Sequence, residues 1–248
     1  MTVNAAGYHD PLRAVVIGAG GGIGGALLTR LESDTRVDAV FGFARDPRRI
    51  DTSKAHTGAI DVLDENSIAA AAAQATADGP LDIVIVATGI LHRDTLQPEK
   101  SLRELAATSM ADVFAVNTIG PALVAKHFLP TLRRGHKTVF AALSARVGSI
   151  GDNRLGGWTS YRASKAALNQ ILKTLSIEQF RRRPESIVVG LHPGTVDTGL
   201  SKPFQKRVPD NKLFTPEASA AYLLNVLDEL DTKDSGQVFA WDGSPIPN

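Results

Sequence analysis

The sequence predicts an α/β fold in which a doubly wound parallel sheet is covered by helices on both faces. Six short apolar stretches have the length and composition of buried strands, at residues 14–17, 39–43, 83–87, 138–143, 187–191 and 237–241. Longer segments with the apolar spacing of helices separate them, among them residues 22–31, 66–77, 110–132 and 161–180. Because these strands are apolar throughout and alternate with helices, they should form a parallel sheet buried between two helix layers.

Length and composition narrow the class of protein. The 248 residues are 43% hydrophobic and 21% charged, which suits a single globular domain spanning residues 1–248. A formal net charge of +1 gives no reason to expect a nucleic-acid or membrane partner. The absence of cysteine excludes disulfides and thiolate metal sites, and we expect no metal centre. Nothing resembles a signal peptide and no run approaches roughly 18 apolar residues, so we expect a cytoplasmic protein.

A glycine-rich turn follows the first predicted strand and leads directly into a helix. It contains Gly18, Gly20, Gly22, Ile23 and Gly24. Glycines at such a turn let the backbone approach a pyrophosphate, and the helix N-terminus adds N–H donors and a positive dipole. A tight turn without a ligand is the alternative. The strand before it and the helix after it favour nucleotide binding.

The end of the second strand bears on the choice between NADP(H) and NAD(H). Asp38 has the sequence distance from Gly18 expected of a ribose-binding carboxylate, but it precedes the strand. Arg45 stands at the strand end, where an arginine suits a 2′-phosphate. Asp46 partly offsets this charge, and Arg48 and Arg49 close behind can be explained as solvated side chains. NADP(H) is therefore favoured, with NAD(H) left open.

Two further groups of residues are candidates for the cofactor. Asp61 and Val62 follow a third short apolar stretch, where a carboxylate could meet the adenine amino group. An aspartate that starts a turn is an equal alternative. The strand at 83–87 ends in the small residues Ala87, Thr88 and Gly89, which would leave room for a ribose at the carboxyl edge of the sheet.

Tyr161 and Lys165 lie four residues apart at the start of a helical segment, so the phenol and the ammonium project from one face. A cation this close favours the phenolate and predicts a lowered tyrosine pKa. A phenol tuned in this way can exchange a proton with a carbonyl or alcohol oxygen. A packed tyrosine beside a solvated lysine is the more common outcome for this spacing alone.

Asn117 and Ser144 are candidates that surround this pair. Asn117 stands four residues before Pro121 inside the helix predicted at 110–132. Proline lacks the N–H that would bind the Asn117 carbonyl, so we expect a kink and a free carbonyl able to hold a water. A simple bend of the helix is the alternative. Ser144 follows the strand at 138–143 and could hold a substrate oxygen, or serve only as a turn residue.

A Pro-Gly turn follows the next strand, with Pro193, Gly194, Val196 and Thr198. At the sheet edge this turn could bring backbone groups and hydroxyls to a nicotinamide ring. His192 precedes it, and we favour a structural histidine over a general base. Residues 200–214 are mixed in character and are expected to form a mobile flap over the substrate.

Taken in this order, the motifs resemble the classical short-chain dehydrogenases/reductases. The likeness extends from Gly18 to Gly243, and the loop at 148–158 together with the phrase at 161–169 is most similar to the carbonyl-reductase and C-factor-like branch. The resemblance implies a single-domain Rossmann fold of about seven strands, by the usual plan of such folds, and a nicotinamide cofactor. Each motif alone is weak evidence for this family, whereas all of them in this order are strong evidence.

The resemblance implies a role for each matched residue. Tyr161 would be the proton donor, and Lys165 would hold the ribose and lower the pKa of the phenol. Asn117 would anchor a proton-relay water, and Ser144 would steady the carbonyl. The cofactor would be bound by Gly18, Gly20, Gly22, Ile23, Gly24, Arg45, Asp61, Val62, Ala87, Thr88, Gly89, Asn117, Tyr161, Lys165, Pro193, Gly194, Val196 and Thr198.

The sequence departs from the family pattern at three places. Ile17 stands where threonine is usual, and residues 86–89 replace N-N-A-G. The third departure concerns the catalytic serine, which in the family is usually the second serine of an S-S-x-x-G pattern. When the glycine of this pattern is aligned with Gly148, the first serine falls on Ser144 and the second on Ala145. A one-residue slip along a strand would turn the hydroxyl away from the tyrosine, unless a bulge re-aims it. We expect Ser144 in the site, with a site that lacks any serine as the alternative.

The sequence therefore predicts an oxidoreductase that moves a hydride between NADP(H) and a small ketone, aldehyde or secondary alcohol. The alternative is a cofactor-binding sensor or signalling protein of the C-factor-like kind, with vestigial turnover. A homo-oligomer is left open. An intact Tyr161, Lys165 and Asn117 favour the enzyme.

Overall fold

A seven-stranded sheet forms the centre of the computed structural model, which describes residues 2–3, 7–93 and 95–247. All neighbouring strands pair in parallel. From one edge to the other the strands are β11 (Val238–Ala240), β8 (Ser186–His192), β7 (Thr138–Leu143), β6 (Ile83–Val86), β3 (Leu12–Ile17), β4 (Val37–Ala44) and β5 (His56–Ala59). The chain therefore builds outward from β3 in one direction and from β6 in the other. The predicted doubly wound fold is confirmed.

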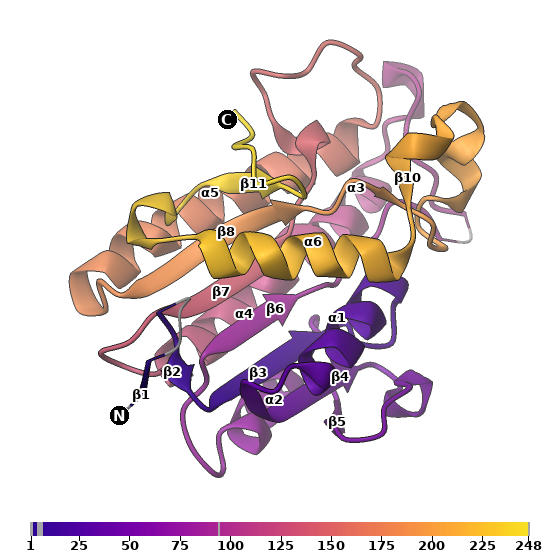
Figure 1. The fold of residues 1–248 in the computed structure, drawn as a ribbon. Helices are drawn as coiled ribbons and strands as arrows, with labels where there is room; N and C mark the ends of the chain where they lie inside the picture. The colour runs from indigo at the N-terminus through magenta and orange to yellow at the C-terminus, as the bar shows by residue number, and fades with distance from the viewer. Residues whose placement is uncertain (1, 4–6, 94, 248) are drawn as a thin grey trace.

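Helices cover both faces of this sheet, as Figure 1 shows. On the side facing the viewer lie α1 (Gly22–Ser33) and α6 (Pro216–Glu229). The opposite face carries α2 (Glu65–Ala75), α4 (Gly120–Phe128) and α5 (Thr159–Arg182). Short strands outside the main sheet pair as β1 (Thr2–Val3) with β2 (His9–Asp10) and β9 (Thr195–Val196) with β10 (Leu213–Phe214).

The strands are apolar throughout because each one faces both helix layers. In β3, Ala14 and Val16 join the core shared with α1 and α6, whereas Val15 and Ile17 join the core shared with α2, α4 and α5. Successive side chains of a strand point to opposite faces, so both sets must be apolar. The edge strand β5 has no such pattern, since its residues are mostly exposed. It corresponds to the third short apolar stretch expected before Asp61, for which the sequence analysis gave no bounds.

The helix predicted at 110–132 is interrupted at its centre. It runs as α3 (Ala107–Phe114), a π-helical segment (Ala115–Ile119) and α4. The N–H of Gly120 donates to the carbonyl of Ala115, five residues back. Pro121 follows directly and has no N–H to continue the regular pattern. The helix is thus irregular at Asn117, as a π turn, whereas the expected kink and free Asn117 carbonyl stay predictions.

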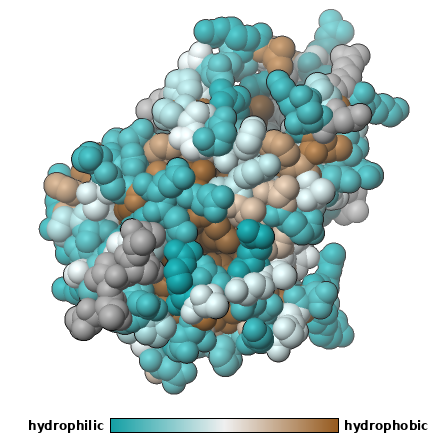
Figure 2. Space-filling view, viewed as in Figure 1, coloured by the Kyte–Doolittle hydropathy of each residue, from teal (hydrophilic) through white to brown (hydrophobic). Residues whose placement is uncertain are grey.

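This interrupted helix is also the one segment within the described ranges that could cross a membrane by length and composition, from Ala107 to Thr131. Its α4 portion packs on the sheet, where Val124, Ala125 and Phe128 are fully buried. The segment is therefore a core helix of this fold. On the α1 and α6 face, hydrophilic residues dominate and hydrophobic ones gather towards the centre (Figure 2).

Candidate active site

The glycine-rich turn is compact because two of its glycines leave no room for a side chain. Gly18 has a φ of +92°, and a Cβ there would lie 3.0 Å from the carbonyl carbon of Ala87. A Cβ on Gly24 would lie 2.2 Å from the carbonyl oxygen of Gly18. Gly24 therefore lets α1 pack directly on the turn, instead of lining a ligand site.

The start of α1 is suited to an anion. Its N-cap is Gly21, and no side chain caps the first turn. The first N–H groups of a helix lack partners within the helix and attract negative charge. Gly22 lies close to the Pro-Gly turn, because a Cβ added to it would lie only 2.7 Å from the Cγ2 of Thr198. The two motifs, far apart in sequence, thus meet at one end of the sheet.

A cleft of about 840 Å³ lies at the carboxyl ends of β3, β4 and β6. Eight of the predicted cofactor residues line it: Gly18, Gly20, Arg45, Asp61, Val62, Ala87, Thr88 and Gly89. It is completed by residues that the sequence analysis did not select for the cofactor: Gly21, Ala44, Asp46, Arg49, Ile60, Leu63, Ile90, His92, Arg93, Val116, Gly199 and Leu200. Most of these are small or apolar residues without a distinctive sequence signal.

The other predicted cofactor residues do not line this cleft: Gly22, Ile23, Gly24, Asn117, Tyr161, Lys165, Pro193, Gly194, Val196 and Thr198. Gly194 has a φ of +78° and a Cβ there would clash with the Phe214 ring, so this glycine is required by packing. The carbonyl of Pro193 accepts a hydrogen bond from the Ser219 hydroxyl at 2.9 Å. The Pro-Gly turn is thereby held against α6 and β10.

The charges at the end of β4 separate into a pair and two unpaired arginines. Asp46 accepts two hydrogen bonds from the Arg48 guanidinium, at 2.9 and 3.1 Å. This contact lowers the pKa of the Asp46 carboxyl. Arg45 and Arg49 line the cleft, and no ion pair to either is found among the described residues. The negative charge of Asp46, which the sequence analysis set against Arg45, is therefore paired directly with Arg48.

Asp61 starts a turn and also lines the cleft, so its predicted contact with the adenine stays a prediction. One carboxylate oxygen accepts the N–H of Leu63 at 3.0 Å, which is the hydrogen bond of an aspartate-started turn. The same residue lines the cleft. Its own N–H donates to the hydroxyl of Ser67 at 2.9 Å, so the turn is fixed to the start of α2.

The Thr88 hydroxyl is buried at this cleft, and within the described part of the chain it has no hydrogen-bond partner. Buried polar groups are normally paired, because an unpaired one loses its hydration without compensation. A hydroxyl left in this state at a cleft wall is suited to a ligand that supplies the missing partner. The sequence analysis assigned Thr88 to the cofactor on position alone.

Asn117 is fully buried and clamps the loop after β6. Its side-chain oxygen accepts the N–H of Ile90 and its amide donates to the Ile90 carbonyl, both at 2.8 Å. The amide also lies 3.2 Å from the Ser164 hydroxyl on α5. Asn117 therefore joins the β6 loop to the helix that carries Tyr161. Neither Ile90 nor Ser164 could be recognised as its partner from sequence spacing.

Tyr161 and Lys165 are both buried on α5, with the Lys165 Nζ 5.9 Å from the centre of the phenol ring. Nζ donates to the carbonyl of Leu143 at 2.7 Å. Burial raises the pKa of Tyr161 to about 12 and lowers that of Lys165 to about 8. The expectation of a lowered tyrosine pKa is therefore wrong for the chain by itself. Loss of hydration outweighs the neighbouring ammonium, which is itself poorly solvated.

Ser144 and its neighbour face different surroundings. The Ser144 hydroxyl donates to the side-chain oxygen of Asn169 at 2.5 Å, and the register between β7 and β8 is regular up to Leu143. Ala145 belongs to the apolar cluster of Leu91 and Tyr161. Ser144 as the carbonyl-binding residue stays a prediction, and this geometry favours its alternative.

A chain of aromatic rings connects the cleft to Tyr161. The His92 ring lies 5.7 Å from that of Phe204, and its Nε2–H donates to the Gly199 carbonyl at 3.1 Å. Phe204 contacts Trp158 at 5.0 Å, and Trp158 contacts Tyr161 at 6.3 Å. Phe204 belongs to the segment predicted as a flap, which here forms two short 3₁₀ helices and β10. Its mobility stays a prediction.

His192 ends β8 with a buried Nδ1 that has no hydrogen-bond partner in the described residues. Burial and the positive charge of Arg146 lower the pKa of His192 to about 4. The ring is therefore neutral at neutral pH. This agrees with the structural role favoured from the sequence, without testing it.

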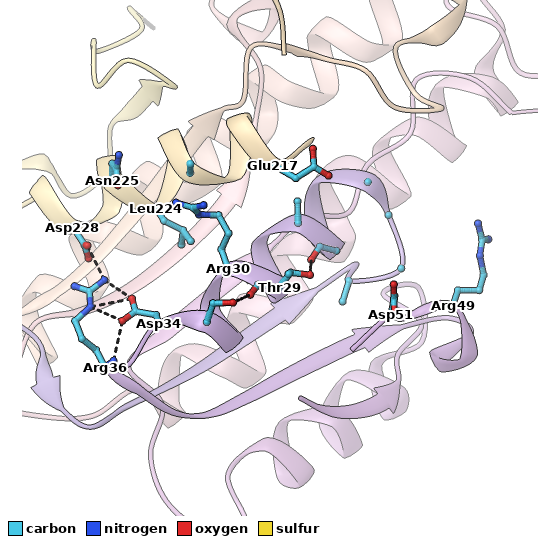
Figure 3. Close-up of a pocket in the computed structure, with 18 residues that line it drawn as sticks. Thr29, Arg30, Asp34, Arg36, Arg49, Asp51, Glu217, Leu224, Asn225 and Asp228 are labelled. Carbon is cyan, nitrogen blue, oxygen red and sulfur yellow. Dashed lines mark hydrogen bonds and ion pairs between the residues drawn. The ribbon is translucent and has the colours of Figure 1, made fainter. Parts of the chain in front are cut away.

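A second hollow, of about 790 Å³, lies between α1 and α6 on the other side of the glycine-rich turn (Figure 3). At one end, Arg36 donates to both Asp34 and Asp228. These contacts raise the pKa of the guanidinium and pair three of the charged side chains that line this hollow, which contains few of the predicted cofactor residues. We therefore place the candidate site in the cleft at β3, β4 and β6.

The sequence profile of the family described as short chain dehydrogenase matches residues 13–209. This range includes the glycine-rich turn, the cleft and the pair of Tyr161 and Lys165. The chain belongs to the short-chain dehydrogenase family. It is thus a short-chain dehydrogenase/reductase, as its motifs predict, and the family is one of oxidoreductases.

Several relatives of this dehydrogenase are known by name. It is 35% identical over 170 residues to the C-signal of Myxococcus xanthus, a match that covers 68% of this chain and 93% of that protein. It is 33% identical over 186 residues to 1-hydroxy-2-glutathionyl-2-methyl-3-butene dehydrogenase of a Rhodococcus species, covering 75% and 76%. The NADPH-bound carbonyl reductase from chicken fatty liver superposes with a TM-score of 0.82 at 27% identity, over 100% of this chain and 99% of that one. The predicted resemblance to the carbonyl-reductase and C-factor-like branch is confirmed.

Proposed function

We propose that this protein is an NADP(H)-dependent oxidoreductase that reduces a small ketone or aldehyde, or oxidises the matching secondary alcohol. The observation that carries the proposal is the position of Tyr161, buried beside Lys165 within an apolar cluster. The raised pKa keeps this phenol protonated at neutral pH. Reduction of a carbonyl needs such a donor, because the product oxygen must gain a proton.

The cleft fits a dinucleotide in its chemistry. The uncapped start of α1 suits a pyrophosphate, and the unpartnered Thr88 hydroxyl suits a polar group of the cofactor. When bound, a nicotinamide cofactor supplies the hydride that adds to the carbonyl carbon. Gly18 and Gly20 would lie against the phosphates, Asp61 and Val62 against the adenine.

Lys165 would hold the ribose on the nicotinamide side. Its Nζ lies 3.7 Å from the position of a Cβ on Gly89, so the absent side chain of this glycine leaves it next to the cleft wall. An ammonium has three N–H donors, and only one is used by Leu143. Asn117 holds the β6 loop in place, and we retain the relay water at its backbone carbonyl as part of the proposal.

A preference for NADP(H) over NAD(H) is supported by charge. Arg45 and Arg49 line the cleft at the end of β4 without an ion-pair partner within the described ranges, while Arg48 neutralises Asp46. A guanidinium such as that of Arg45, with no ion pair among the described residues, suits a 2′-phosphate, and a ribose hydroxyl would leave its charge uncompensated. The chicken carbonyl reductase, solved with NADPH, is consistent with this choice.

A second function is favoured by the C-signal relative, which covers 68% of this chain. In this alternative the protein binds the cofactor as part of a signalling role and turns over slowly or not at all. The presence of Tyr161, Lys165 and Asn117 supports the enzyme, because a signalling protein has no need of a buried proton donor beside a lysine.

The test is NADPH oxidation over a panel of ketones and aldehydes, with Tyr161→Phe as the matched variant. The variant loses the transferable proton and little packing, so turnover should fall by about 10² to 10⁴-fold, the usual range for general acid catalysis. Its NADPH affinity should stay near that of the wild type. A loss below about tenfold would refute the role of Tyr161. NADPH binding without turnover on any carbonyl would favour the signalling alternative.

A further inference from the structure

The loop before α5 ends in an unusual backbone conformation. Gly156, Gly157 and Trp158 have φ values of +63°, +66° and +54° in succession. Trp158 is the sole non-glycine residue with a positive φ within the described ranges. A bulky side chain adopts this left-handed conformation at a cost in free energy, so the surrounding contacts must hold it there.

Glu99 supplies those contacts from the loop after β6. Its carbonyl accepts the N–H of Trp158 at 2.5 Å. Its carboxylate accepts the N–H of Ser160 at 3.1 Å and also the Ser160 hydroxyl. The Glu99 residue is only 3% exposed. Glu99 therefore binds the chain on both sides of residue 159. It also accepts an N–H in the first turn of α5, for which the helix itself provides no acceptor.

The turn places the Trp158 ring over the phenol of Tyr161. The rings meet edge to face at 6.3 Å, and Phe204 meets Trp158 in the same way at 5.0 Å. Leu91 and Ala145 complete an apolar cluster around the phenol. Phe204 covers one part of the Trp158 ring, and because Trp158 is only partly buried, the rest of its ring surface stays open next to the proposed proton donor.

We infer that Trp158 is the specificity-determining residue of the carbonyl site, and that Glu99 is the positioning residue that holds it. This inference rests on the proposed function and names its substrate class. The site takes ketones or aldehydes whose carbonyl carries a planar apolar group, which packs against Trp158 while the oxygen meets Tyr161. An aromatic ring gains from edge-to-face contact beyond the area it buries, whereas a saturated ring of the same size does not.

The test compares acetophenone with cyclohexyl methyl ketone, which is similar in size but not planar. The wild type should prefer acetophenone in kcat/KM, and Trp158→Leu should reduce this preference by about 3- to 10-fold, the range of aromatic pair energies. Trp158→Phe should restore most of it. The change should lie mainly in KM, with NADPH affinity unaltered. An unchanged ratio in folded Trp158→Leu, or in Trp158→Gly, which suits a positive φ, would overturn the inference.

The Glu99 part is tested by Glu99→Ala beside Glu104→Ala. Glu104 also accepts a backbone N–H, that of Lys100, but it is exposed and does not contact the turn. Glu99→Ala keeps the backbone carbonyl that binds Trp158 but removes the carboxylate that binds Ser160. It should lose part of the acetophenone preference while NADPH affinity is kept, and Glu99→Gln should recover some of that loss. Glu104→Ala should retain the wild-type ratio. A Glu99→Ala protein with the wild-type ratio would refute the positioning role.

The inference is separable from the proposed function. If none of the ketones supports NADPH oxidation by the wild type, the proposed function fails. Binding of the ketones to the protein then still tests the role of Trp158. Trp241→Phe leaves Trp158 as the single tryptophan of the chain. The acetophenone concentration that half-saturates the quenching of its fluorescence should be at least several-fold below that of cyclohexyl methyl ketone. Equal half-saturating concentrations for the two ketones would overturn the inference.

Discussion

The Ser144 hydroxyl donates a hydrogen bond to the side-chain oxygen of Asn169, one helical turn beyond Lys165 on α5. The Ser144 hydroxyl is therefore hydrogen-bonded to helix α5 and directed to Asn169. Ala145 is the residue that packs with Tyr161. By the family resemblance, a catalytic serine would stand at this second position, so we expect a methyl group where a hydroxyl would steady the substrate oxygen.

The first prediction separates these two positions. Ser144→Ala should keep kcat/KM within a few-fold and cost about 1 kcal/mol of stability, because it removes one hydrogen bond. Ala145→Ser should raise kcat/KM at least about tenfold, since one well-placed donor to the oxygen is commonly worth 10² to 10³-fold. Both are measured on the same ketone with saturating NADPH, alongside urea denaturation. A hundredfold loss in folded Ser144→Ala would instead return Ser144 to the site.

These residues also mark how far the sequence could predict the molecule. The sheet was predictable because strands such as 14–17 and 83–87 are apolar on both faces, and the break at Asn117 because Pro121 lacks an N–H. The strand β5 was expected only as a short apolar stretch without bounds, because an exposed edge strand needs no apolar pattern. Contacts such as Ser144 with Asn169 depend on three-dimensional packing, which sequence spacing does not encode.

The direction of the Tyr161 pKa shift could likewise not be predicted from the sequence. Spacing on a helix correctly put Lys165 near the phenol, and from this we predicted a lowered pKa. The burial of both groups could not be predicted from that spacing. Burial disfavours charge on each, so it raises one pKa and lowers the other.

The second prediction concerns cofactor choice at the end of β4. Arg45→Ala should reduce the preference for NADPH over NADH by about 1.5 to 3 kcal/mol, the range for a hydrogen bond to a charged group. Arg181→Ala is the control, because Arg181 lies exposed in the last turn of α5 and does not line the cleft. Titrations of the wild type and both variants with each cofactor give the affinities needed. Equal NADPH and NADH affinities in the wild type would refute the assignment of Arg45.

The third prediction follows from the buried Lys165. Its pKa is lowered from 10.5 to about 8, so between these pH values the unfolded chain binds more protons than the folded one. The free energy of unfolding should therefore rise with pH across this window, by up to about 3 kcal/mol for a shift of this size. Lys165→Met removes the group, so its advantage over the wild type should shrink as pH rises from 7 to 10.

Urea denaturation of the cofactor-free proteins at several pH values measures this difference. Lys173→Met provides the control, because Lys173 lies exposed on the same helix, where solvent screens its charge. Its stability relative to the wild type should change much less with pH. A constant difference between Lys165→Met and the wild type would show that Lys165 is better solvated than its position indicates.

The fourth prediction uses the buried hydroxyl of Thr88, which has no hydrogen-bond partner in the part of the chain that the structure describes. Thr88→Val replaces it with a methyl group of similar size. A buried hydroxyl without a partner costs about 1 to 3 kcal/mol, so the variant should unfold at a higher temperature than the wild type when no cofactor is bound. NADPH affinity should fall, because the proposed partner of the hydroxyl belongs to the cofactor.

Thr138→Val is the matched control for this last prediction. Thr138 is also buried, but its hydroxyl donates to that of Ser186 at 3.1 Å, at the start of β7 and far from the cleft. Its replacement should lower the unfolding temperature and leave NADPH affinity unchanged, because it breaks an existing hydrogen bond. The two variants should thus move stability in opposite directions. If Thr88→Val also lowers stability and binds NADPH as the wild type does, the Thr88 hydroxyl has a partner within the protein and no role in the cofactor site.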